Sequence, residues 1–191
     1  MRICVLTPLY VNETSNNGGT PVVHYFAREW VKMGHEVIVF NIMARYPRVY
    51  YFVSRLFRDW LSTRNGMVVP TRQPKNGSYM VEGVSVRSVC LRKYLPHSRY
   101  DMKQLEFAID YITKAFQKNG IPDIFIGHWD NPQMEILYEL KHKYHKPTCL
   151  VFHNNRFGLK EKYGESYQRF LKGLDIIGFR NIGAKTDFER K

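Results

Sequence analysis

Cysteine is scarce in this sequence, with three residues in 191 and no C-x-x-C pair. Cys4, Cys90 and Cys149 each lie in an apolar run that predicts a strand. We therefore interpret them as small buried side chains in a reducing compartment. The seven histidines are scattered and have no cysteine partners, so the sequence shows no zinc-binding pattern and we expect no metal site.

Long hydrophobic runs are also missing. No apolar run approaches the roughly 20 residues that a membrane-spanning helix needs. The opening MRICVLTPLY has one basic residue and a few apolar ones before its proline, which is too short for the hydrophobic region of a signal peptide. We therefore expect a cytoplasmic protein, with the inner face of the membrane as a candidate site of peripheral attachment.

Several motifs of well-known enzyme classes are absent. The loop after residues 2–7 lacks G-x-G-x-x-G spacing, and Thr20 and Pro21 stand where a G-x-x-x-x-G-K-[ST] loop needs lysine, which disfavours a nicotinamide cofactor and a P-loop ATPase. There is no G-x-S-x-G, no H-E-x-x-H and no D-x-D pair to hold a divalent ion against a nucleotide diphosphate. Chemistry in this chain would then depend on positioning and electrostatics without a metal.

Acidic residues are in short supply: 17 Asp and Glu face 29 Lys and Arg, giving a formal net charge of +12. This surplus favours partners that carry negative charge, namely nucleic acid, an acidic membrane surface or a phosphorylated substrate. No DNA- or RNA-binding motif is recognised and the aromatic residues follow core spacing, so a nucleic-acid partner is disfavoured.

What the sequence does contain is an alternation of strand and helix patterns. Apolar, β-rich runs predict strands at residues 2–7, 36–40, 122–128, 147–155 and 175–179. Helical patterns separate or follow them at residues 20–34, 102–120, 131–144, 166–174 and 183–191. Thr20 is a good N-cap with Pro21 after it, and Gly34 is placed to end the helix in a left-handed conformation. The alternation predicts one α/β domain over residues 1–191, built on a doubly wound parallel sheet.

The middle of the chain departs from this alternation. Residues 79–91, YMVEGVSVRSVCL, alternate around Glu82-Gly83 and predict a β-hairpin at the edge of the sheet. Upstream, residues 48–61 predict an amphipathic helix. Its apolar half holds Val49, Phe52, Val53, Leu56, Phe57, Trp60 and Leu61. Its polar half holds Arg48, Ser54, Arg55, Arg58 and Asp59.

Two interpretations of that amphipathic segment are open. The favoured one packs its apolar half onto the sheet. In the other, Trp60 and Phe57 enter lipid headgroups while Arg55 and Arg58 contact acidic lipid. The arginines, with Arg45 among them, are also candidates for binding the phosphate of an acidic acceptor.

Three of the predicted strands run into chemically unusual loops. Because ligands bind beyond the carboxyl ends of strands in open α/β sheets, we expect the residues of these loops to share one rim. They are Gly18, Gly19, His128, Trp129, Asp130, His153, Asn154 and Asn155. Adjacent glycines before a helix expose backbone N–H groups to an anion; the alternative is a simple tight turn. Histidines at strand ends are either binding groups or capping hydrogen-bonders.

These residues resemble the GT-B glycosyltransferases of the group 1 (family 4) class. RICVLTPLYVNETSNNGGTPVVHYFAREWVKMGHEVIVF is similar to the first strand, Gly-Gly loop, helix and GHEV turn of that family. PDIFIGH and KPTCLVFHNN are similar to its strands that end in histidine, GVSVRSV to its edge hairpin, and DIIGFRNIGAKTDF to its last strand and helix. The resemblance covers nearly the whole chain apart from the middle segment. It implies the Rossmann-like, acceptor-side N-terminal domain of such an enzyme.

The resemblance also implies an activity. The complete enzyme would transfer a hexose from a nucleotide sugar to a glycan or lipid-linked acceptor, with retention of configuration, no metal, and no cofactor besides the nucleotide-sugar substrate. The donor-binding C-terminal domain is absent from this chain, which alone would be inactive. The alternative is a non-catalytic basic domain of the same fold that binds nucleic acid or an acidic membrane surface.

Individual residues carry over from the family by position. His153 matches the catalytic histidine at the reacting centre, and Gly18 and Gly19 match the Gly-Gly near the donor diphosphate. The residues expected on the acceptor side are His128, Asp130 and Asn154. His128 matches the family's strand-end histidine, and the other two are its neighbours on the rim.

Overall fold

The computed structural model describes residues 1–11, 21–65, 69–96, 98–153 and 158–189. Its strands are β1 (Arg2–Thr7), β2 (Glu36–Arg45), β3 (Gly77–Val81), β4 (Val84–Arg92), β5 (Ile124–His128), β6 (Thr148–Phe152) and β7 (Ile176–Phe179). They form one sheet in the order β3-β4-β2-β1-β5-β6-β7. Every neighbouring pair is parallel except β3 and β4.

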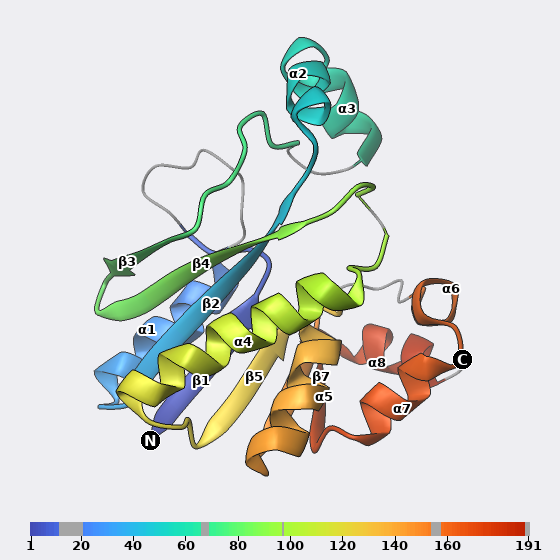
Figure 1. Ribbon diagram of the computed structural model, residues 1–191. Helices are drawn as coiled ribbons and strands as arrows, with labels where there is room; N and C mark the ends of the chain where they lie inside the picture. The colour runs from blue at the N-terminus through green and yellow to red at the C-terminus, as the bar shows by residue number, and fades with distance from the viewer. Residues whose placement is uncertain (12–20, 66–68, 97, 154–157, 190–191) are drawn as a thin grey trace.

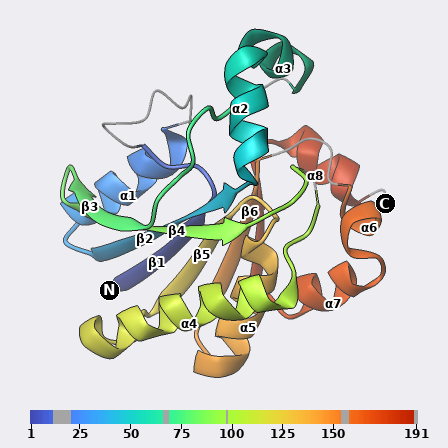
Figure 2. The same cartoon turned by 45° about the horizontal axis from the view of Figure 1, so that its top comes forward.

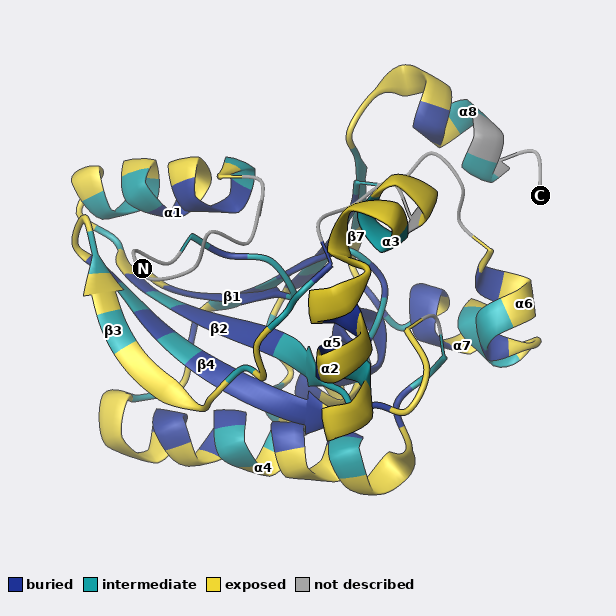
Figure 3. Cartoon of the chain, turned by 90° about the horizontal axis from the view of Figure 1, so that it is seen from above, coloured by how far each residue is buried: buried dark blue, intermediate teal, exposed yellow. Residues whose placement is uncertain are grey.

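Helices connect these strands. They are α1 (Val22–Lys32), α2 (Arg48–Leu56), α3 (Arg58–Asn65), α4 (Met102–Asn119), α5 (Gln133–Tyr144), α6 (Leu159–Tyr163), α7 (Ser166–Lys172) and α8 (Ile182–Glu189). Helix α1 covers one face of the sheet, and α4 lies on the opposite face (Figure 3). Helix α5 packs beside α4 and against β5 and β6.

The strand order confirms the predicted doubly wound fold. The six parallel strands, numbered along the chain, lie in the order 3-2-1-4-5-6 that defines the Rossmann arrangement. The order reverses between β1 and β5, where Leu6 pairs with Gly127. A crevice for ligands is expected at the carboxyl ends of these two strands.

The predicted edge hairpin is confirmed as well. Strand β3 pairs antiparallel with β4, and Val81 is opposite Val84 across a two-residue turn. Glu82 and Gly83 have φ angles of 45° and 82°. Two consecutive left-handed residues fit a type I′ turn, whose twist matches that of the flanking strands.

Strand β1 is buried on both faces, as its continuous apolar sequence predicts. Ile3 and Val5 belong to the core beside α1, whereas Cys4 and Leu6 belong to the core beside α4 and α5. Cys4 and Cys90 are buried free thiols, as expected, whereas Cys149 is only partly buried. Desolvation raises the pKa of both thiols, which supports their interpretation as small apolar side chains.

The C-terminal end of α1 follows the sequence prediction. Gly34 has a φ of 85°, and the N–H of His35 donates to the carbonyl of Trp30 at 3.0 Å. This left-handed glycine satisfies carbonyls that the helix would otherwise leave unpaired. The predicted N-cap, Thr20, lies outside the described residues.

The segment after β2 corrects one prediction. Residues 48–61 form two helices, α2 and α3, separated at Phe57, and the apolar half of α2 does not pack on the sheet. The physical reason is that β2 continues to Arg45, beyond its predicted end at residue 40. The longer strand carries α2 and α3 past the edge of the sheet (Figure 1).

The contact between β5 and α5 allows a direct test of packing. A Cβ added at Gly127 would lie 2.6 Å from Cδ1 of Leu137 and 3.3 Å from Cβ of Gln133. We expect Gly127→Ala to lower the free energy of unfolding by about 1–3 kcal/mol, because the fully buried side chain of Leu137 must move within a packed core. Chemical denaturation measures this, with Gly77→Ala as control, since nothing lies within 4 Å of a Cβ there. Equal losses in both variants would refute the crowding explanation.

Candidate functional site

Two histidines meet where β5 and β6 end, at the carboxyl edge of the sheet. His128 is the last residue of β5, and His153 directly follows β6. Nδ1 of His128 lies 2.8 Å from Nε2 of His153, within hydrogen-bond distance. The sequence prediction that these two residues share one rim is therefore confirmed.

Burial favours the uncharged form of both imidazoles. His128 is only 2% exposed, and this burial, together with the neighbouring His153, lowers its pKa to about 3. Burial and then the charge of Arg180 lower the pKa of His153 as well. A desolvated imidazole favours its uncharged form because the low-dielectric surroundings penalise charge.

The hydrogen bond between the rings fixes which nitrogens carry protons. Nε2 of His128 is buried and has no hydrogen-bond partner among the described residues. An orphaned buried N–H is rarer than an under-satisfied acceptor. We therefore assign the proton of His128 to Nδ1, which donates to Nε2 of His153. The half-buried His153 then carries its own proton on Nδ1 and can donate it to a ligand.

Trp129 supports this pair from an unusual backbone conformation. Its φ is 66°, in the left-handed region that bulky residues rarely adopt. The indole stacks on His153, with 4.3 Å between ring centroids and 26° between the planes. The backbone N–H of Trp129 donates to the carbonyl of Val151 at 2.9 Å, and this bond holds the strained residue against β6. Strain of this kind concentrates at functional sites.

Asp130 lies on the same rim and is engaged by α6. Its carboxylate accepts a hydrogen bond from Nζ of Lys162 at 2.5 Å, and its carbonyl accepts one from the hydroxyl of Tyr163 at 3.3 Å. Its predicted role in acceptor binding stays a prediction, since this carboxylate already has a cationic partner.

A buried ion pair beside Asp130 was missed by the sequence analysis. Arg99 donates to Oε1 of Glu135 at 2.5 Å, and Glu135 is 3% exposed. Burial raises the pKa of this carboxyl group, while Arg99 opposes the shift. The available signal was a glutamate inside the run MEILYEL, between the apolar residues Met134 and Ile136, both of which are buried.

Lys93 places a buried amine near Asp130 and Lys162. It follows β4 and is buried, and its Nζ lies 4.8 Å from the ring centre of Tyr100. Burial and then the charge of Lys162 lower the pKa of its amine to about 8. An amine this poorly solvated gains from an anionic ligand more than an exposed lysine would.

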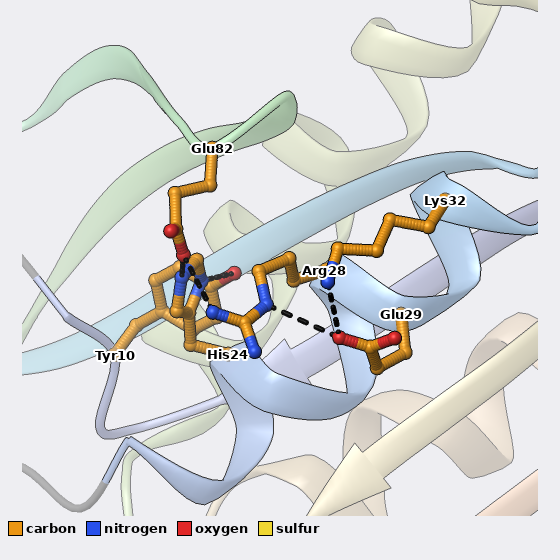
Figure 4. Close-up of polar contacts among 6 residues, drawn as sticks. All are labelled: Tyr10, His24, Arg28, Glu29, Lys32 and Glu82. Carbon is orange, nitrogen blue, oxygen red and sulfur yellow. Dashed lines mark hydrogen bonds and ion pairs between the residues drawn. The ribbon is translucent and has the colours of Figure 1, made fainter.

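The start of the loop between β1 and α1 is held by a polar network (Figure 4). The hydroxyl of Tyr10 lies 3.0 Å from Nδ1 of His24, whose Nε2 lies 2.6 Å from Oε2 of Glu82. Arg28 reaches the same carboxylate at 3.4 Å. The network joins the loop, α1 and the hairpin turn, and so fixes the route by which the chain leaves β1.

Three predicted site residues, Gly18, Gly19 and Asn154, lie outside the described residues. Their flanking elements do reach the rim: β1 ends at Thr7 beside β5, and β6 ends directly before His153. The predicted roles of the glycines in phosphate binding and of Asn154 in acceptor binding stay predictions.

Arg55, Arg58 and Trp60, predicted to meet a membrane or an acidic acceptor, lie on α2 and α3. All three are exposed, and these helices project beyond the sheet (Figure 2). The structure thus separates the predicted residues into a polar site on the rim and a surface on the projection.

The described part of the chain offers neither a metal-binding cluster nor a membrane-spanning helix. No group of three or more His, Cys, Asp or Glu residues there is arranged to hold a metal ion. Among the helices described, none has the length and apolar character to cross a bilayer.

Comparison with known proteins gives a limited result. No family model matches the sequence, and no curated protein does. Among solved structures, the chain is similar to UDP-GlcNAc 2-epimerase from Methanocaldococcus jannaschii, with a TM-score of 0.46 and 11% identity. The match covers 100% of this chain and 42% of that one, so this chain spans less than half the length of that structure. The fold assignment rests on the strand order described above.

Proposed function

We propose that this chain is the acceptor-side domain of a GT-B glycosyltransferase, one that transfers a hexose from a nucleotide sugar to a glycan or glycolipid acceptor. The observation that carries the proposal is the neutral pair of His128 and His153 at the carboxyl edge of a Rossmann-like sheet. The motif resemblance of the sequence supports the same assignment. No metal or additional cofactor is part of the proposal.

The chemistry of the pair suits a sugar substrate. A neutral His153 with a proton on Nδ1 donates a hydrogen bond to a hydroxyl or to an oxygen that gains negative charge as the glycosidic bond to the nucleotide breaks. In the assigned arrangement His128 donates to Nε2 of that ring, because the reverse direction would place a proton on Nε2 of His128, which is buried and has no partner among the described residues. The proton of His153 is then on Nδ1. Trp129 fixes the plane of the same ring.

The remaining roles concern charge. In the proposal, the backbone at Gly18 and Gly19 receives the donor diphosphate near the start of α1, where a helix favours an anion. His128, Asp130 and Asn154 form the acceptor side. The poorly solvated Lys93 offers a further contact for an acidic acceptor group. The donor sugar nucleotide would be held mainly by a second domain.

The test uses the full-length protein that carries this chain. We expect His153→Ala to lower the release of nucleoside diphosphate from a nucleotide-sugar panel by about 100-fold, the size of effect that a positioned proton donor supplies. His153→Asn should recover part of that loss, because its amide N–H can replace the donor. His142→Ala is the matched control, since His142 is exposed on α5, where its ring hydrogen-bonds the Tyr138 carbonyl. A full rate in His153→Ala would refute the proposed role.

The charge of +12 supports a second candidate, a non-catalytic domain that binds polyanions. A salt-dependent gel shift with random oligonucleotides separates the two. Tight binding of nucleic acid by the chain, with no nucleotide-sugar turnover by the full-length protein, would favour this alternative.

A further inference from the structure

Helix α2 is amphipathic in the opposite sense to most surface helices. Val49, Phe52, Val53 and Leu56 follow the i, i+3, i+4, i+7 spacing of one helix face, and all four are exposed, Phe52 by 63%. The face turned inward holds Ser54, which is 0% exposed, together with Tyr51. A helix of a globular protein normally turns its apolar stripe toward the core. Here the stripe faces solvent.

The exposed apolar surface continues onto α3. Phe57 is 55% exposed and Trp60 is 59% exposed. In Figure 3, most of the ribbon of α2 and α3 has the colour of exposed residues. We call the exposed side chains of Val49, Phe52, Val53, Leu56, Phe57 and Trp60 the apolar ridge. Several large apolar side chains exposed along two consecutive helices mark a site of interaction with another apolar phase or molecule.

The ridge is bordered by arginines. Residues 45–72 contain six arginines, no lysine and one acidic residue, Asp59, so their formal charge is +5. The guanidinium of Arg64 lies 5.3 Å from the ring centre of Trp60. Arginine beside an interfacial aromatic side chain suits a surface that offers phosphate oxygens next to hydrocarbon.

A basic hollow lies at the foot of α2. It has a volume of about 310 Å³, and its cationic lining residues are Arg45, Arg48, Arg92 and Lys93. Arg45 and Arg92 end the adjacent strands β2 and β4 in register. The hollow therefore places positive charge directly below the apolar ridge.

We propose that the apolar ridge and its arginines dock this protein on the surface of an anionic phospholipid bilayer. The ridge would enter the headgroup region to a shallow depth, while the arginines and the basic hollow would contact lipid phosphates. The positive charge around the ridge favours an anionic bilayer as the binding partner. A bilayer of acidic lipid supplies negative charge over the whole area around the ridge, and the chain has a net charge of +12.

Docking in this way would also orient the site. Helices α2 and α3 rise from the carboxyl end of β2, which is the edge of the sheet where β5 and β6 end (Figure 1). The rim that holds the histidine pair would then face toward the bilayer. The docking proposal does not depend on the chemistry at that rim, so failure of the sugar-transfer proposal would leave it standing.

The first test is co-sedimentation of the purified chain with vesicles of phosphatidylcholine alone or mixed with phosphatidylglycerol. We expect binding only to the mixed vesicles, weakening as salt is raised. Replacing Phe52, Leu56 and Trp60 together by serine should weaken binding about tenfold or more, because three inserted apolar side chains are lost. Met80→Ser is the matched control, since Met80 is 69% exposed on β3.

The second test isolates the charge. Changing Arg48, Arg58 and Arg64 to glutamine should weaken binding to the mixed vesicles about fivefold per arginine. The matched control changes the exposed lysines Lys103, Lys118 and Lys172, on α4 and α7, to glutamine. This control removes the same charge from other helices and should have a smaller effect. An equal loss in both variants would mean non-specific attraction and would overturn the docking surface.

Fluorescence and sedimentation separate a bilayer from a protein partner. The emission of Trp60, obtained by subtracting the Trp60→Phe spectrum, should shift to the blue on mixed vesicles. Unchanged vesicle binding in the serine variant would overturn the proposal. The proposal would also be overturned if the wild type formed a dimer, the serine variant were a monomer, and neither protein bound vesicles. The ridge would then be an interface between copies of the chain.

Discussion

Changing Arg99 to methionine should lower the free energy of unfolding by about 3 kcal/mol. Arg99 is the cation that pairs with Glu135, whose side chain is 4% exposed. Without it, the fold must either keep an uncompensated carboxylate among apolar residues or protonate it. Either outcome costs free energy, and chemical denaturation near neutral pH measures that cost.

Two comparisons make this expectation specific. Lys114→Met removes the cation of an equally short ion pair with Asp110, but those side chains are 67% and 58% exposed. An exposed pair of this kind contributes about 0.5 kcal/mol or less. Adding Glu135→Gln to Arg99→Met should recover part of the loss, because the buried charge is removed with its partner. Similar losses for Arg99→Met and Lys114→Met would show that burial of Glu135 does not control the effect.

The fold could be predicted from the sequence because its signals are local. The run RICVLT is apolar on both faces and becomes the central strand β1, while Gly34 and Gly120 end their helices with φ angles of 85° and 81°. Glycine at a helix end and continuous apolar runs report backbone conformation and burial directly. Distant residues were not needed to interpret them.

The path of α2 could not be predicted in this way. Its spacing indicates an amphipathic helix, but periodicity does not reveal which medium the apolar side contacts. That depended on the length of β2, whose last residues NIMAR are only partly apolar and extend the strand to Arg45. The extension moved the ridge away from the core that the sequence analysis expected it to join.

The candidate site was predictable in part. The ends of β5 and β6 identified His128 and His153, because parallel strands place their carboxyl ends on one edge. Arg99 pairs with Glu135, and Lys162 pairs with Asp130. The two partners of each pair are far apart in sequence, and only the tertiary fold brings them together. A contact between two residues that are far apart in sequence produces no motif with a recognisable spacing.

Acid should destabilise the protein through the histidine pair. In the unfolded chain His128 binds a proton below a pH of about 6.5, whereas in the folded chain its pKa is lowered to about 3. Between these values the unfolded state binds more protons, so the free energy of unfolding falls as the pH falls. The stabilising contribution is fully present above the unfolded pKa. Below it, the loss approaches about 1.4 kcal/mol per pH unit.

The measurement compares wild type with His128→Gln by chemical denaturation from pH 7 to about pH 4, a range set by the two pKa values. Glutamine does not titrate, so the variant should be less stable at neutral pH but show a shallower decline in acid. The carboxylates contribute equally to both proteins, and the difference between the two curves therefore reports His128. Parallel curves would mean that folding leaves the pKa of His128 unchanged. The burial that lowers this pKa, and with it the buried hydrogen bond from which the tautomers of the pair are assigned, would then have to be given up.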